Sequence, residues 1–285
     1  MRKSIDHYVS IVDDLDAARE AYHRLGFNVR PPALHVKLGS SNCVVIFPDT
    51  YLELIHIGDA PPWLADAYLP RLQAGPGLCH VSLTAHRLNE EHERLAALGY
   101  AADTPASASR KVIMPDGRED QTDSNFMYNW KPERRYVSLF FSEHLKPETI
   151  FISGHTTHPN GAVDTKRIVA VSEEPTADRP YYQDSYGYPA AQSNSDGFVM
   201  LGGRGDAVEV LTPEAAQRRY APLLDGLELA GLGGFPVALH LSVHDIAATR
   251  AYLADVGVAF TEFASGLATA RTDGVGNIIV FEPKG

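Results

Sequence analysis

IDHYVSIVDDLDAAREAYHRLGF (residues 5–27) decides the fold of this chain, because its strand-then-helix pattern is repeated. The pattern returns as LCHVSLTAHRLNEEHERLAALGY (78–100) and as PVALHLSVHDIAATRAYLADVGV (236–258), and a fainter copy interrupted by two prolines occupies residues 165–188. Four units of this length are too long for a small solenoid repeat. They predict a duplicated α+β module.

The first unit shows the order of elements that we expect in each copy. Strict alternation after residue 5 predicts a strand. The helix that follows begins at Asp14 or Asp16, which suit an N-cap, and ends at Gly26. Two apolar segments, 42–47 and 51–57, predict further strands. The order is therefore βαβββ.

The segments between the units predict the domain organisation. Residues 59–77 contain four prolines and two glycines and are expected to be a connector. Residues 103–125 form a polar, turn-rich insert in the second unit. The natural domain boundary lies within residues 153–164. We therefore predict two domains, 1–158 and 159–285, each made of two modules.

Composition narrows the class of protein. The net charge is −11, from 36 acidic and 25 basic residues, and there is no long basic run, so a nucleic-acid partner is not expected. There is no apolar run long enough to cross a membrane, and the N-terminus lacks the apolar segment of a signal peptide. Cys43 and Cys79 are expected to be buried thiols. These features predict a cytoplasmic enzyme or binding protein.

Histidines at equal positions in the first two units suggest a metal site. His7 and His80 each stand eight residues before the shared leucine, so a pseudo-twofold axis would bring them to one cavity. Glu53 lies in the apolar segment 51–57, and a buried carboxylate needs a partner. Two imidazoles and one carboxylate suit a catalytic divalent cation such as Fe²⁺, Mn²⁺ or Zn²⁺. The second unit offers Glu143 or His144 as a further group, of which only one enters the cavity if the strand is regular.

At these residues the chain resembles the vicinal oxygen chelate superfamily, and specifically its glyoxalase-like branch. The resemblance rests on IDH (5–7), LGF (25–27), HVKLGSSN (35–42), YLEL (51–54) and FFSEHLKPE (140–148). It implies α+β domains in which paired βαβββ modules close a U-shaped mixed sheet around a cavity. It also implies a divalent metal held by the first and last strands of the modules, which fits His7, His80 and Glu53, with His144 as a further ligand.

The C-terminal half departs from that pattern. Arg167 and Ala238 stand where the first-strand histidines would be, and the last strand (276–282) offers apolar residues at the carboxylate position. Glu209 alone matches Glu53. We therefore expect the metal in the N-terminal half and a structural or degenerate C-terminal half.

Other polar residues are candidates for substrate contact or catalysis. His35 is a possible general base, with Tyr128 and Glu143 as further catalytic candidates. Substrate contacts are expected from four residues of the insert and its strands: Arg110, Asn129, Trp130 and Tyr136.

The resemblance leaves three functions open. The first is metal-dependent isomerase or lyase chemistry on a small oxygenated molecule, through a metal-stabilised enolate. The second is extradiol-type ring cleavage with Fe²⁺, and the third is metal-free binding of a small molecule. A homodimer is compatible with each of these functions.

Overall fold

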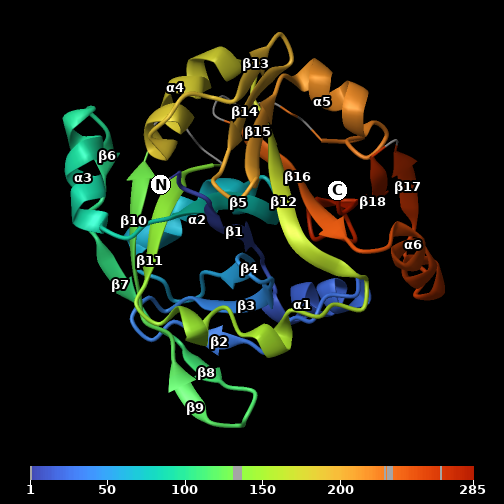
Figure 1. Ribbon diagram of the computed structural model, residues 1–285, viewed down its shortest axis with the longest axis horizontal. Helices are drawn as coiled ribbons and strands as arrows, with labels where there is room; N and C mark the ends of the chain where they lie inside the picture. Colours follow the sequence, from blue (N-terminus) through green and yellow to red (C-terminus); the bar gives the residue numbers. More distant parts are fainter. Residues whose placement is uncertain (1, 131–136, 228, 230–233, 264) are drawn as a thin grey trace.

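The chain forms two large mixed sheets, one from each half of the sequence (Figure 1). The computed structural model describes residues 2–130, 137–227, 229, 234–263 and 265–285. In the N-terminal half the elements are β1 (Ile5–Ile11), α1 (Leu15–Arg24), β2 (Ala33–Leu34), β3 (Ser41–Ile46), β4 (Tyr51–His56), α2 (Pro62–Gln73), β5 (Gly77–Thr84), α3 (Leu88–Ala97), β6 (Ala101–Ala102), β7 (Ala106–Ala108), β8 (Lys111–Ile113), β9 (Glu119–Gln121), β10 (Ser124–Trp130) and β11 (Leu139–His144). In the C-terminal half they are β12 (Ala162–Val171), α4 (Pro175–Tyr186), β13 (Gln192–Asn194), β14 (Gly197–Leu201), β15 (Ala207–Leu211), α5 (Pro213–Tyr220), β16 (Phe235–Val243), α6 (Ile246–Asp255), β17 (Phe260–Phe263), β18 (Gly266–Thr269) and β19 (Ile278–Pro283).

Both sheets have the same pattern of strand pairing. At the centre of each, the first strands of two modules pair antiparallel, β1 with β5 and β12 with β16. Each of these central strands also pairs in parallel with the last strand of its own module. For example, β1 pairs with β4, and β16 pairs with β19. The predicted α+β fold of four βαβββ modules in two mixed sheets is confirmed. The change of sheet falls between β11 and β12, and the domain division at residue 158 stays a prediction.

The repeated helix is defined by its ends. In α1 the side chain of Asp14 accepts a hydrogen bond from the backbone N–H of Ala17 at 2.9 Å, which satisfies an otherwise free donor of the first turn. After α1 the chain reverses at Gly26, whose φ of +84° favours glycine. A Cβ atom there would lie 2.6 Å from the ring of Tyr252 on α6. Gly26 therefore ends the helix and lets the two halves approach.

The expected connector at residues 59–77 was wrong, since most of it is helix α2. Pro62 occupies the first turn, where its missing N–H costs no intrahelical bond. Leu64 and Tyr68 are buried, and Arg71 Nε donates to the carbonyl of Leu78 at 2.8 Å at the start of β5. Burial on the sheet thus outweighs the interior Pro70, and α2 closes one end of the first half.

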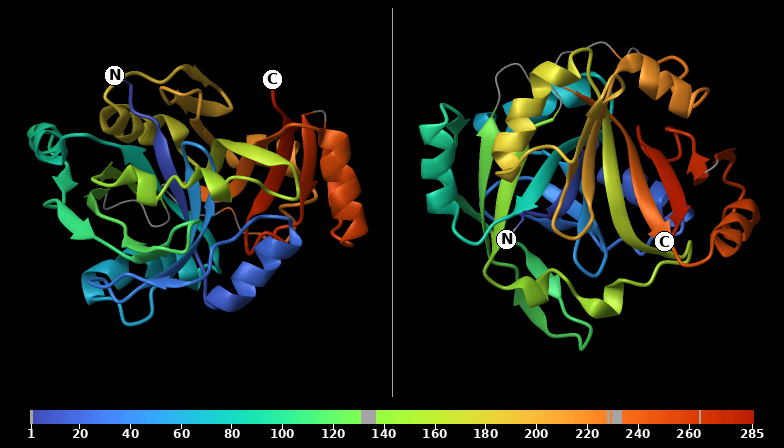
Figure 2. Two further views of the ribbon diagram at one scale, coloured as in Figure 1. Left: turned by 60° about the horizontal axis from the view of Figure 1, so that its bottom comes forward. Right: turned by 45° about the horizontal axis from the view of Figure 1, so that its top comes forward.

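The two halves share one apolar core. Phe27 stacks on Phe281 with ring centroids 6.1 Å apart, and Asn277 accepts a hydrogen bond from the N–H of Leu78 at 2.6 Å. In both figures α3 and α6 lie at opposite ends of the molecule, while the hairpin β8–β9 projects from the body (Figures 1 and 2). Among the described residues, no helix has the length and apolar character needed to cross a membrane.

Candidate active site

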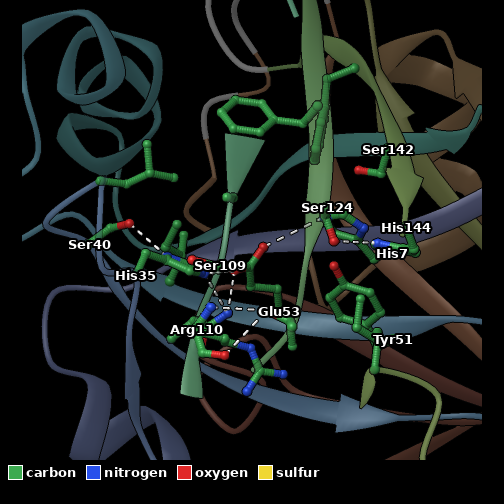
Figure 3. Close-up of a pocket in the computed structure, with 18 of the residues that line it drawn as sticks. His7, His35, Ser40, Tyr51, Glu53, Ser109, Arg110, Ser124, Ser142 and His144 are labelled. Carbon is green, nitrogen blue, oxygen red and sulfur yellow. Dashed lines mark hydrogen bonds and ion pairs between the residues drawn. The ribbon is translucent and has the colours of Figure 1, made fainter. Parts of the chain in front are cut away.

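A pocket lies against the first sheet, walled by β1, β4, β10 and β11, by α2 and by the loops before β3 and β10 (Figure 3). The cavity has a volume of about 100 Å³, and its mouth opens to solvent. The pocket is lined by six of the residues that the sequence singles out: His7, His35, Glu53, Arg110, Tyr128 and His144.

Glu53 is the carboxylate at the centre of the pocket. The register of β4 places it beside Val9 of β1, and its side chain is buried. Its Oε1 accepts a hydrogen bond from Asn42 Nδ2 at 2.6 Å and lies 3.7 Å from His35 Nε2, whereas its Oε2 lies 3.7 Å from His7 Nε2. Burial lowers the pKa of His35. One oxygen of Glu53 is therefore fixed by an amide, and the other faces an imidazole.

Asp6, a residue that the sequence analysis did not select, holds two of the pocket histidines. Its Oδ1 lies 2.6 Å from His7 Nδ1 and 2.9 Å from His144 Nε2, and His144 Nδ1 lies 2.7 Å from the hydroxyl of Ser124. Burial alone would raise the pKa of Asp6, but the two histidines outweigh it and hold that pKa well below its usual range. Asp6 therefore fixes the ring of His7 with Nδ1 as the donor, so that Nε2 faces Glu53.

A bulge explains why Asp6 reaches the same side as His7. The pairing of β1 with β5 shifts between Ile5 and His7, so Asp6 has no direct partner on β5. In a regular strand, neighbouring side chains point to opposite faces. The extra residue of a bulge re-aims its side chain. Asp6 stands next to His7 in the sequence, but the alternation of a regular strand predicts that its side chain points away from that of His7.

The structure does not bring His80 to the pocket. Its Nδ1 accepts a hydrogen bond from the backbone N–H of Ser138 at 3.0 Å, and its Nε2 lies 3.0 Å from the carbonyl of Ala67 in α2. Both ring nitrogens are therefore used by the backbone. Burial lowers the pKa of His80 to about 4, so the ring is neutral at pH 7. His80 is a structural residue that attaches α2 to the sheet.

The strand register shows which residue is the true counterpart of His7. His7 lies opposite Ser82 of β5, at the centre of the pseudo-symmetric pair. Ser82 donates a hydrogen bond to Ser142 of β11, a pocket residue, at 2.8 Å. The equal offset of His7 and His80 from their leucines reflects the helix repeat and not the pairing of the strands. The position that faces His7 is thus two residues beyond His80.

His80→Asn is expected to change how the stability of the protein depends on pH. Between the usual histidine pKa of about 6.5 and the folded value, the unfolded chain binds more protons, so the free energy of unfolding falls as the pH falls. Asparagine can still accept from Ser138 but loses the bond to Ala67, which costs about 1–3 kcal/mol at pH 7.5. Urea unfolding at pH 7.5 and pH 5 should show a smaller acid loss in the variant, with exposed His86→Asn as the control. Equal acid losses in wild type and His80→Asn would contradict this role.

The remaining candidates lie around the pocket or away from it. Tyr128 lines the pocket, and its hydroxyl lies 2.6 Å from that of Tyr68. Trp130 stacks on Tyr128 from outside and donates to Asp103 at 2.6 Å. Asn129 donates to Ser185 of the C-terminal half at 3.0 Å, because it faces the other side of β10. Glu143 does not line the pocket and accepts from Asn125 at 3.4 Å, and Tyr136 lies outside the described residues.

The predicted metal ligands His7, His80, Glu53 and His144 do not form a common site. His80 and His144 use both ring nitrogens in other bonds. His35 brings a second imidazole to Glu53, but the amide nitrogen of Asn42 lies 3.2 Å from His35 Nε2 and 2.6 Å from Glu53, where it donates an N–H. Within the described parts of the chain, no three histidine, cysteine, aspartate or glutamate side chains form a group that could hold a metal ion. As arranged, these donors do not fit a metal.

The C-terminal half has the same strand register as the N-terminal half, but cationic side chains lie at the positions that correspond to the pocket. Arg167 and Glu209 occupy the register positions of His7 and Glu53, as the sequence predicts. Opposite Arg167 lies His240, which is the counterpart of Ser82, and Glu282 of β19 is the counterpart of Ser142. The expectation of apolar residues at the carboxylate position of this last strand was wrong, because the true strand register lies two residues further along and places Glu282 there.

Glu282 lies among one imidazole and two cations. It lies 2.8 Å from His240 Nδ1, 2.7 Å from Lys166 Nζ and 3.0 Å from Arg167 Nη2. Glu209 pairs with Arg219 at 2.7 Å. The second half is therefore closed, at the position that corresponds to the pocket, by ion pairs between two buried carboxylates and partly exposed cations.

The sequence and fold together place the chain in a family. A family model described as a glyoxalase-like domain matches residues 5–184. Since the match covers more than half of the chain, the chain belongs to this family, and the resemblance drawn from the repeat is confirmed.

Solved structures agree with this fold. A hypothetical protein from Staphylococcus aureus has a TM-score of 0.69 at 10% identity, with 99% of this chain and 100% of that one covered. A mutant of 4-hydroxymandelate synthase from Streptomyces coelicolor has a TM-score of 0.62 at 13% identity, with 100% and 94% covered. A xylose isomerase-like TIM barrel/4-hydroxyphenylpyruvate dioxygenase fusion protein has a TM-score of 0.55 at 12% identity, with 100% and 49% covered. At such identities the likeness shows the fold alone. None of the curated proteins is similar to the chain in sequence.

Proposed function

We propose that this member of the glyoxalase-like family is an enzyme that moves a proton on a small carbonyl compound, with Glu53 as the base and His7 as the acid. The observation that carries the proposal is the facing of Glu53 Oε2 and His7 Nε2 across 3.7 Å in a buried pocket. This separation is too long for a direct hydrogen bond. A substrate atom at the edge of the gap can therefore contact both groups.

The reaction proceeds by transfer of a proton from carbon to Glu53. The proton leaves a C–H group next to the carbonyl for Oε2 of Glu53, and its electron pair remains on the substrate as an enolate. His7, protonated on both nitrogens, donates its Nε2–H to the enolate oxygen, while its Nδ1–H stays on Asp6. Where the carbon that lost the proton also bears a hydroxyl group, return of the proton from Glu53 to the former carbonyl carbon, with the hydroxyl proton passing back to His7, gives isomerisation. Where the carbon on its other side bears a leaving group, the enol proton returns to His7, the carbonyl re-forms, and the leaving group departs with the proton that Glu53 holds, which gives a lyase reaction.

The negative charge of Asp6 supports this role of His7. A charged His7 in the pocket needs a compensating anion, and Asp6 lies 2.6 Å away. Ring-opening dioxygenation would instead require bound Fe²⁺, for which the donors found in the pocket are not arranged. The geometry therefore favours proton transfer by the protein's own groups.

Hydrogen–deuterium exchange tests the proposal. The protein, dialysed against a chelator, is incubated in D₂O with methylglyoxal, dihydroxyacetone or phenylpyruvate, and proton NMR follows the loss of the C–H signal above the buffer rate. We expect exchange with at least one compound, unchanged when Zn²⁺, Mn²⁺ or Fe²⁺ is added. Asp6→Asn removes a charge-assisted hydrogen bond and should slow this exchange by about tenfold to a hundredfold.

The matched control is Asp13→Asn, which removes the same charge from an exposed position of the same segment. It should leave the exchange rate unchanged. Exchange that appears only after a metal is added would overturn the metal-free reaction. Binding of these compounds without exchange would show a binding protein instead of an enzyme.

A further inference from the structure

Arg110 provides a positive charge in the pocket that no protein group neutralises by contact. Its side chain lines the pocket near Glu53 (Figure 3), yet in the described part of the chain its guanidinium has no hydrogen bond and no carboxylate within 4.0 Å. Burial lowers the pKa of Arg110, and the attraction of Glu53 does not offset this cost. A partly buried cation without a direct protein partner can pair with an anionic ligand that enters the pocket.

The backbone holds Arg110 in place at the base of the β8–β9 hairpin. Its N–H donates to the hydroxyl of Thr122 at 3.0 Å, and its carbonyl accepts from the N–H of Thr122 at 2.9 Å. A bridge pairs it with His35, which is the residue beside Glu53. The backbone of Arg110 is therefore held in the pocket wall by hydrogen bonds, and its guanidinium does not extend from a free loop.

The pocket selects one class of anion. A planar guanidinium pairs with a carboxylate through two parallel hydrogen bonds. A phosphate dianion would need more positive charge, but Arg110 is the only lysine or arginine among the described residues of the lining, and Glu53 adds a negative charge. A monoanion thus matches this pocket better than a dianion.

The rest of the pocket requires an apolar substrate body. Phe126, Tyr128 and Phe140 form an aromatic wall, with ring centroids 6.0 Å apart for the first two and 4.8 Å apart for the last two. Leu64 and Ile150 add aliphatic surface. An aromatic or branched aliphatic group buries its surface against this wall.

We propose that the substrate is a small monocarboxylate with an apolar body, whose carboxylate pairs with Arg110 while its reactive carbon lies at Glu53 and His7. The inference rests on the proposed function for the position of the reactive carbon. The binding of the carboxylate, in contrast, does not depend on turnover. The two can therefore be tested separately.

Binding of simple probes tests the carboxylate site. Phenylacetate, phenylacetamide and phenylphosphonate share a ring and differ in charge, and titration followed by NMR of the protein measures their dissociation constants. We expect phenylacetate to bind about tenfold to a hundredfold more tightly than the amide, as for a charge-assisted pair, and more tightly than the phosphonate. Arg110→Met should abolish the preference for the acid over the amide, and Arg110→Lys should keep only part of it.

Lys111→Met is the matched control, because it removes a positive charge from the next residue, which is exposed and lies outside the pocket. It should keep the preference. Equal binding of acid and amide, tighter binding of the phosphonate, or a preference that survives in folded Arg110→Met would overturn the inference. If phenylacetate is preferred but no C–H exchange is found, the carboxylate site stands and the proposed reaction fails. If C–H exchange is found but phenylacetate is not preferred, the proposed reaction stands and the carboxylate site fails.

Discussion

Glu53→Gln should reduce the exchange rate by on the order of 10²–10⁴-fold, since the amide cannot accept the proton. The substitution preserves the shape of the side chain, and its oxygen can still accept from Asn42, so the fold should be retained. Glu53→Asp keeps a carboxylate but withdraws it from His7 by one methylene, and its rate should lie between those of wild type and Glu53→Gln. The measurement is the NMR exchange assay, with thermal unfolding to confirm the folded state.

The control for this prediction is Glu20→Gln, an equal change of charge at an exposed position of α1. It should not alter the rate. Binding of phenylacetate should persist in Glu53→Gln and become tighter, because a negative charge leaves the pocket. A folded Glu53→Gln protein with wild-type exchange would remove Glu53 from the role of base.

The repeat was sufficient to predict the modules, because its two periods are local properties of the chain. A two-residue alternation followed by a helical pattern and a glycine specifies strand, helix and turn wherever it occurs. Helix α2 was missed for the same reason. Its prolines argue against a helix locally, and its stability comes from burial of Leu64 and Tyr68 on the first half.

The site was only partly predictable, because its geometry depends on how strands pair. His7, Glu53, His35 and Arg110 could be selected from their residue types and positions, and all four line one pocket. The place of His80 could not be foreseen, since the register of β1 against β5 is set by long-range packing and shifted by a bulge.

The same shift had a larger consequence in the C-terminal half. The repeat in the sequence sets Ala238 against His80, and on that alignment the pairing of His240 with Glu282 is missed. Each half thus carries a carboxylate on the last strand of a module, beside the central strands. The N-terminal half has Glu53 on β4, and the C-terminal half has Glu209 on β15 and Glu282 on β19. They differ in what meets the carboxylate. Side chains of lysine and arginine fill that position in one half, whereas the other leaves a pocket.

Glu282→Gln should lower the free energy of unfolding by about 1–3 kcal/mol at pH 7, because it weakens the charge-assisted hydrogen bonds that the buried carboxylate accepts. Burial would raise the pKa of Glu282, but His240, Lys166 and Arg167 outweigh it and hold that pKa well below its usual range. Its stabilisation is therefore present above the usual glutamate pKa of about 4.3 and is lost as the pH falls toward the folded value. Urea unfolding should show a large difference between wild type and variant at pH 7 and a smaller one at pH 3.5.

Glu262→Gln provides the comparison, since Glu262 pairs with Arg250 at 3.0 Å on an exposed surface where ion pairs contribute at most about 1 kcal/mol. If Glu282→Gln costs no more than Glu262→Gln, the C-terminal network does not stabilise the fold. If the predicted loss is found while the pocket of the Glu282→Gln protein still binds phenylacetate, the two halves have separate tasks. Ion pairs would then close the second half for stability, and the first half would keep its carboxylate accessible to a ligand.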